Sequence, residues 1–191
     1  MQIDPDATIS FETPQEFAAW LADHHARQNE VWIKLYKKAS GIPSITWEEA
    51  VIEALAWGWI DAIKKSGGED HWFQRFTPRK PRSAWSAKNR AHAEKLIAEG
   101  RMQPPGLAQI EAAQKDGRWH KTYAGQSSFQ MPRDVLEAIA AEPRAQAHYD
   151  ALDRRNRFAI YLRVISAKKP ETRTRRIAGF VDMLTRGEKL Y

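Results

Sequence analysis

The sequence predicts an α+β fold: a small, mostly antiparallel sheet packed by helices, followed by an all-helical C-terminal region. Residues 30–37 alternate apolar and polar side chains, which is typical of a half-buried strand. Residues 59–65 and 71–77 read as an antiparallel strand pair joined by a glycine-rich turn. After residue 130, apolar residues recur at helical spacing. We therefore expect an α+β domain over residues 1–130 and a helical region over 131–191 packed on it.

Two capping boxes predict the helix starts in the first third of the chain. Residues 9–11 form a candidate short edge strand, and Thr13 then opens a capping box with proline at the first helical position. Thr46 opens a second capping box. That second helix is expected to end at Gly58 and to bury Trp47, Val51, Ala54 and Leu55.

Prolines and glycines divide the remainder of the chain. Residues 78–81 are expected to form a rigid basic corner, followed by helices over 83–99 and 104–116 and a long loop over 117–131. Further helices are predicted to start at Pro132, Pro143 and Pro170. Between them, residues 156–166 should form a helix. The inward residues of the last two long helices are predicted to be Phe158, Tyr161, Leu162 and Ile165, and then Ile177, Phe180, Val181 and Leu184.

Composition excludes several classes of protein. The 191 residues include no cysteine, so disulfides, thiol nucleophiles and thiolate metal sites are ruled out. No run of eighteen apolar residues is present, so no transmembrane helix is expected. The acidic N-terminal stretch lacks the features of a secretory signal, and a cytoplasmic location is therefore expected.

Basic residues are concentrated in two blocks. Residues 64–90 carry eight basic side chains against two acidic ones, and residues 153–191 carry eleven against four. By contrast, residues 1–63 carry four against ten. Such blocks attract phosphates, nucleic acid or other anions, and they also occur as solvated faces balanced by acidic regions.

The first basic block is interleaved with tryptophans, which favours a pocket for a small anionic or nucleotide-like ligand. Arginines grip phosphate or carboxylate bidentately, and indoles stack on planar rings. The alternative is that the tryptophans are core and the arginines pair with the acidic N-terminal region. The candidate ligand-binding residues in this block are Trp59, Asp61, Arg75, Thr77, Arg79, Arg82, Trp85 and Asn89.

Support for catalysis or metal binding is thin. Asp61 has the chemistry of a general base, but a structural pairing with Arg75 or Lys65 is favoured, because buried carboxylates are normally paired. The serines lack a nucleophile-elbow context. The six histidines are scattered, without metal-ligand spacing. We assign no catalytic residue, no cofactor and no metal, and a binding protein is favoured over an enzyme.

The second basic block supplies a candidate extension of the site. Lys168, Arg173 and Arg176 surround the start of the last predicted helix, and they are candidates to meet the same ligand. Two helices joined by a tight turn also resemble a helix-turn-helix, so a nucleic-acid-binding module that uses both basic blocks is the alternative function. Against it, the turn lacks the usual glycine and no Asn or Gln stands at the helix start. No protein partner is predicted.

Three strings recur in the order expected for one known group of bacterial proteins. They are GWIDAIKK at 58–65, RFTPRKPRSAWSAKN at 75–89 and SAKKPETRTRR at 166–176. With TPQEFAAWL and WIKLYKK nearer the N-terminus, the chain resembles the YdeI/OmpD-associated family, whose members are described as bacteriocin-protection proteins. The resemblance implies a role in tolerance of antimicrobial peptides or envelope stress, and it implies no particular catalytic residue or cofactor.

Overall fold

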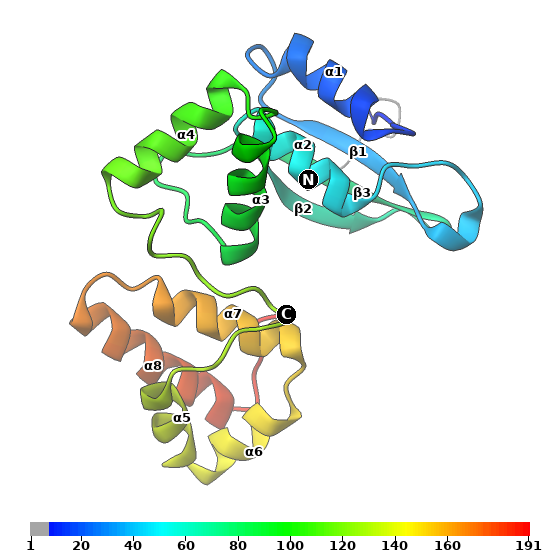
Figure 1. The fold of residues 1–191 in the computed structure, drawn as a ribbon. Helices are drawn as coiled ribbons and strands as arrows, with labels where there is room; N and C mark the ends of the chain where they lie inside the picture. The colour runs from blue at the N-terminus through cyan, green and yellow to red at the C-terminus, as the bar shows by residue number, and fades with distance from the viewer. Residues whose placement is uncertain (1–7) are drawn as a thin grey trace. The chain divides into compact units, whose positions relative to one another are not determined.

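The computed structural model describes residues 8–191, which form two compact units divided between Thr122 and Tyr123 (Figure 1). The first unit holds a three-stranded antiparallel sheet with helices, and the second is all-helical. The predicted α+β class is confirmed. The division into an α+β domain over residues 1–130 and a helical region over residues 131–191 packed on it stays a prediction. The first seven residues of the stretch that argued against a secretory signal lie outside the described part.

The sheet of the first unit has the strand order β1-β3-β2. Its strands are β1 (Val31–Tyr36), β2 (Trp59–Ser66) and β3 (His71–Pro78), each close to its predicted range. The short strand predicted at residues 9–11 is reduced to one parallel bridge between Ile9 and Ile33. Both outer strands therefore hydrogen-bond to β3, the central one.

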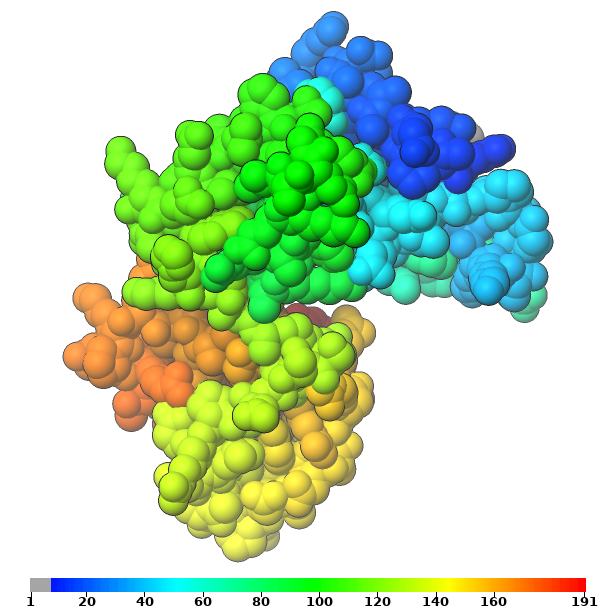
Figure 2. All heavy atoms as spheres, in the orientation of Figure 1, coloured from blue at the N-terminus to red at the C-terminus, as the bar shows by residue number. Residues whose placement is uncertain are grey.

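Side-chain caps or N-terminal prolines begin the α-helices of this unit. The helices are α1 (Pro14–His24), the 3-10 turn η2 (Lys38–Ser40), α2 (Trp47–Ala56), α3 (Ala87–Ala98) and α4 (Pro104–Lys115). Thr46 and Glu49 complete the predicted capping box of α2. Helix α3 begins four residues later than predicted, because Ser86 accepts the N–H of Asn89 and fixes the first turn there. Helices α3 and α4 both contact α2. In the space-filling view, green residues of the α3 region lie beside cyan residues of the α2 region (Figure 2).

The core of the first unit lies between the sheet and α1, α2, α3 and α4. Phe17 and Leu21 of α1 pack with Ile33, Leu35 and Phe76 of the sheet. Gly58 ends α2 with φ +75, a conformation that favours glycine, and a Cβ there would lie 2.8 Å from the Pro105 carbonyl oxygen. Trp47 was predicted to be buried, and this prediction is wrong: its side chain is 39% exposed. Trp47 is the first residue of α2, and the buried residues of this helix begin only at Ala50.

The second unit consists of α5 (Arg133–Ala140), α6 (Pro143–Ala151), α7 (Arg154–Ile165) and α8 (Pro170–Thr185). The predicted inward face of α8 is confirmed, with Phe180 and Leu184 buried. The predicted face of α7 is only partly correct. Ile160 and Val164 enter the core, while Phe158 and Leu162 line an open cavity of about 370 Å³. Helix α7 has two apolar stripes, so periodicity alone does not select the core one.

A buried asparagine holds the last residues of the chain in the second unit. Asn156 is 2% exposed, and its Oδ1 accepts the N–H groups of Leu190 and Tyr191, each at 3.0 Å. Its Nδ2 donates to Asp153. Within residues 8–191, no helix has both the length and the apolar character needed to cross a bilayer.

Candidate functional site

A β-bulge in β2 determines which charged side chains share a face of the sheet. Asp61 pairs with Phe76 and Lys64 pairs with Gln74, so the two residues between them lie opposite Arg75 alone. In a regular strand, residues three apart point to opposite faces. The extra residue of the bulge places Asp61 and Lys64 on the same face. The Gln74 side chain supports the bulge by donating to the Ile63 carbonyl at 3.3 Å.

Two cavities open on this face, and they share the side chains of Trp47 and Trp72. The first, of about 330 Å³, is lined by these two indoles with Asp61, Lys64 and Gln74. The second, of about 520 Å³, is bounded by the indoles and by residues 41–46 of the loop after β1. Small-molecule sites in proteins typically have volumes in this range. We call the two cavities together the indole site.

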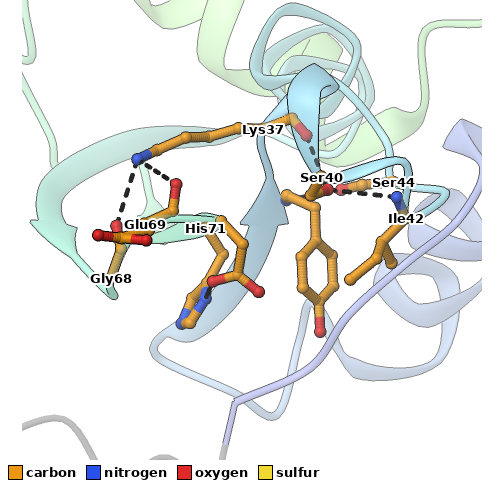
Figure 3. A network of polar contacts seen from close by, with 9 residues as sticks. Lys37, Ser40, Ile42, Ser44, Gly68, Glu69 and His71 are labelled. Atoms are coloured by element: carbon orange, nitrogen blue, oxygen red, sulfur yellow. Dashed lines mark hydrogen bonds and ion pairs between the residues drawn. The ribbon is translucent and has the colours of Figure 1, made fainter.

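The loop that forms one wall of the indole site is fixed by hydrogen bonds. Lys37 Nζ donates to the carbonyls of Gly68 (3.2 Å) and Glu69 (2.8 Å) in the β2–β3 turn (Figure 3). Ser40 Oγ donates to the Lys37 carbonyl and accepts the N–H of Ile42 (Figure 3). Nearby, Ser44 Oγ accepts the N–H of Tyr36. These bonds hold the loop in one shape before any ligand arrives, which lowers the entropic cost of binding.

Asp61 is the acidic group of the site. Burial raises the pKa of its carboxyl, and a hydrogen bond from the Trp47 indole, a backbone hydrogen bond and the Arg79 charge act in the opposite direction. A carboxylate that is partly desolvated yet lines a cavity gains free energy when a ligand offers it hydrogen-bond donors. The sequence favoured a pairing with Arg75 or Lys65. The Arg75 alternative is wrong, because Arg75 lies on the opposite face of β3 and donates to Glu30.

Lysines lie against the faces of both indoles. Lys64 Nζ is 4.6 Å from the centre of the Trp72 ring, and Lys88 Nζ is 5.5 Å from that of Trp47. Lys88 is paired with Glu48 at 2.9 Å, and this contact lowers the pKa of the Glu48 carboxyl. The site therefore combines one carboxylate, one cation with no carboxylate partner in the described residues and two aromatic faces.

The structure places two predicted stacking residues in the core. Trp59 is 1% exposed and packs edge-on to Trp20, with ring centres 6.0 Å apart. Trp85 is also 1% exposed and packs edge-on to Trp119 at 4.9 Å. Neither indole presents a face that a ligand could reach. Tryptophan is a large apolar residue, and clusters of it are more often core than pocket.

None of the predicted arginines lines the indole site. Arg79 is buried, with its guanidinium carbon 3.9 Å from the centre of the Trp85 ring, and its Nη2 donates to the Ala84 carbonyl. Arg82 is exposed and has φ +64 in the corner after β3. Of the other candidates, Thr77 and Asn89 are half-buried, and only Asp61 lines the indole site.

The C-terminal candidates belong to the second unit, where two of them stabilise helix contacts. Arg173 forms two hydrogen bonds of 2.8 Å with Asp134 of α5. Arg176 donates to the Arg163 carbonyl and to Ser166 Oγ at the end of α7. Lys168 is exposed. The proposal that they bind the same ligand as the first unit stays untested.

Trp47, Lys64, Trp72 and Gln74 line the indole site, and the sequence did not identify them as site residues. One pattern in the sequence could have identified Trp72: the alternation of side chains along a strand places it on the same face as Gln74 and Phe76. The bulge that brings Lys64 beside Asp61 has no mark in the sequence. Among residues 8–191, no group of three or more His, Asp or Glu side chains is placed to hold a metal ion.

The position of Arg75 leads to a prediction that separates stability from binding. Its Nε donates to Glu30 at 2.8 Å in a half-exposed ion pair. Arg75→Ala should lower the free energy of unfolding by about 1 kcal/mol and leave binding at the indole site unchanged. Urea unfolding at low and high salt checks the first part, because the loss should shrink as salt screens the pair. A variant with full stability but lost ligand binding would contradict this assignment.

Comparison with known families finds matches over both units. Residues 9–109 match the family described as Domain of unknown function (DUF8412). Residues 128–187 match the family described as Bacteriocin-protection, YdeI or OmpD-Associated. No curated protein and no solved structure gives a significant match. The indole site lies within the first of these matched segments.

Proposed function

We propose that this chain, which belongs to the family described as Domain of unknown function (DUF8412), is a non-catalytic binding protein for a small anionic or nucleotide-like ligand. Its residues 128–187 belong to the YdeI/OmpD-associated family. The indole site is the binding site in this proposal. The supporting observation is that Asp61 and Lys64, of opposite charge, line one cavity between two accessible indoles.

The aromatic and charged groups divide the task of binding. Trp47 and Trp72 offer ring faces, and stacking on such a face contributes about 1–3 kcal/mol for a nucleobase. Lys64 offers an ammonium to a phosphate or carboxylate. The hydrogen-bonded loop beside them keeps the site open in one shape.

The cellular role that we propose is tolerance of antimicrobial peptides or envelope stress, exercised from the cytoplasm. The description of the C-terminal family as bacteriocin-protection supports this role. Cells that lack the protein should be more sensitive to such peptides, and expression of the intact chain should restore tolerance. Restoration by a variant with no ligand binding would separate the cellular role from the indole site.

Nucleic-acid binding remains the alternative function. The second unit carries exposed basic residues on and beside α8, among them Lys168 and Arg175. Binding to DNA or RNA should weaken steeply with added salt, because it releases condensed counterions. Negligible affinity for both at low salt would exclude this alternative.

Two neighbouring lysines give a matched test of the ligand site. Lys64 lines the indole site, while Lys65 pairs with Phe73 on the other face, 5.8 Å from the centre of the Trp32 ring. Nucleoside monophosphates and other small anions should raise the melting temperature of the protein. Lys64→Met should weaken the best ligand about tenfold, and Lys65→Met should change its affinity less than about twofold.

Thermal shift and tryptophan fluorescence titration would measure these effects. No shift with any member of a broad panel of nucleotides and carboxylates would contradict the proposal. Equal losses in the two lysine variants would also contradict it, because a general loss of positive charge would then explain the result.

A further inference from the structure

The charges at the indole site restrict the chemistry of any ligand that binds there. The Asp61 carboxylate repels a bare anion, and Lys64 repels a bare cation. Lysines already lie against both indole rings, so a ligand ammonium would be repelled by like charges there. A ligand that satisfies the site must present donors to Asp61, negative charge to Lys64 and a flat face to an indole.

The number of hydrogen bonds that Asp61 can still accept further restricts the donor groups of a ligand. An ionised carboxylate has about four lone-pair sites. Two of the Asp61 interactions are internal: one comes from the Trp47 indole and one from the backbone N–H of Asp61 itself. About two acceptor positions therefore remain for a ligand. Two acceptor positions on one carboxylate can receive two adjacent donors of a planar ring.

Resting on the proposed function, we propose that the ligand is a guanine nucleotide, with the ring against the indoles, its donor edge at Asp61 and its phosphate towards Lys64. Of the common nucleobases, only guanine presents an N–H and an amino group side by side on its pairing edge. Adenine and cytosine each place an acceptor beside their amino group, and that acceptor would face the carboxylate. Enzymes and binding proteins commonly read bases through this edge.

The cavities accommodate both parts of such a ligand. The 330 Å³ cavity holds Asp61 and Lys64 together, and the 520 Å³ cavity extends from the same indoles along the loop to Lys38. A ring placed against Trp72 would have Asp61 on the neighbouring strand of the same face.

The experiment uses the full-length chain and a set of 5′-monophosphates that differ in single groups. Guanosine monophosphate has both donors, inosine monophosphate lacks the amino group, and xanthosine monophosphate replaces it with a carbonyl. Ribose 5-phosphate has no base. Isothermal titration should show affinity falling about tenfold from guanosine to inosine monophosphate, and by about a further tenfold for xanthosine monophosphate. Ribose 5-phosphate should bind at least about a hundredfold more weakly than guanosine monophosphate.

Asp61→Asn provides the decisive variant, because it exchanges one acceptor for a donor without changing the size of the side chain. It should weaken guanosine monophosphate about a hundredfold and improve xanthosine monophosphate, which reverses the preference. The carbonyl oxygen of the introduced amide can still accept the Trp47 hydrogen bond, so the fold should persist, and circular dichroism would verify this. Asp23→Asn, which alters an exposed acid of α1, is the matched control and should leave the preference unchanged.

The outcomes distinguish the two proposals. If none of the nucleotides or other anions binds, the proposed function fails and the guanine assignment fails with it. If nucleotides bind equally whatever their base edge, or if Asp61→Asn leaves the order unchanged, the guanine assignment alone is overturned. Reversal of the guanine–xanthine preference in Asp61→Asn, and not in Asp23→Asn, supports it.

Discussion

Trp85→Ala is expected to lower the free energy of unfolding of the first unit by about 3–5 kcal/mol, the usual cost of truncating a fully buried tryptophan. The side chain is 1% exposed, packs edge-on to Trp119 and lies under the Arg79 guanidinium. Its removal leaves a cavity and takes away the aromatic face that the buried guanidinium contacts. Urea unfolding of the full chain measures the loss, and hydrogen exchange would assign it to residues 8–122.

Trp57→Ala is the matched control for this prediction. Trp57 is half-buried at the end of α2, with its ring 4.6 Å from that of His25. Truncation there should cost less than half as much, since less apolar surface leaves the core. A Trp85→Ala variant that is as stable as Trp57→Ala would show that the Trp85 region relaxes to fill the gap.

Arg101→Ala is expected to cost about 2 kcal/mol at neutral pH. Its guanidinium donates to Glu53, a residue of α2 that is 8% exposed, and it also contacts Glu99 at 3.2 Å. Without Arg101, the Glu53 carboxylate has lost its charged partner in a buried position. Half of the Arg101 side chain remains exposed, which keeps the expected loss below that of a fully buried pair.

The pH dependence of this variant follows from the pKa of Glu53. Burial raises that pKa above its ordinary 4.5, while Arg101 lowers it. The folded state therefore binds the proton more tightly than the unfolded state, so the stability gained from the bound proton is complete below about pH 4.5 and is lost as pH rises through the folded pKa. Removing Arg101 raises the folded pKa further, so the destabilisation should be larger at pH 7 than at pH 4.

A second substitution tests whether Glu53 is the cause. Glu53→Gln in the Arg101→Ala background should recover most of the lost stability at pH 7, because an uncharged amide costs less to bury than an unpaired carboxylate. A double-mutant cycle in urea measures this coupling. Independent, additive losses would place the contribution of Arg101 elsewhere, for example in its contact with Glu99.

The sequence predicted the elements of the fold well, because local chemistry fixes where they begin and end. Thr46 with Glu49, and Gly58 with its positive φ, act within a few residues and leave clear patterns. The buried face of α7 was harder to predict than the helix boundaries, because Phe158 and Ile160 belong to two different apolar stripes of this helix. Which stripe enters the core depends on helices α5 and α8, and no local pattern contains that information.

Of the ligand-binding residues predicted in the first basic block, only Asp61 lines the indole site. Composition pointed to Trp59 and Trp85, yet the same apolar character that makes an indole a good stacking partner also drives it into the core. The regular alternation of side chains along a strand would place Asp61 and Lys64 on opposite faces of the sheet. The one-residue bulge in β2 places them on the same face. Tertiary contacts decide which side chains are buried, and the hydrogen-bond register decides on which face of the sheet a side chain lies. Neighbouring residues in the sequence determine neither of these.

The bulge in β2 also affects whether the sheets of two molecules can pair edge to edge. β2 lies at one margin of the sheet, where backbone groups are available to pair with a strand of another molecule. An extra residue bends the strand and increases its twist, and Lys64 and Lys65 add charge to the same margin. At the opposite margin, Ile9 bridges to Ile33 of β1. The irregularity that assembles the indole site thus also opposes edge-to-edge aggregation of a three-stranded sheet.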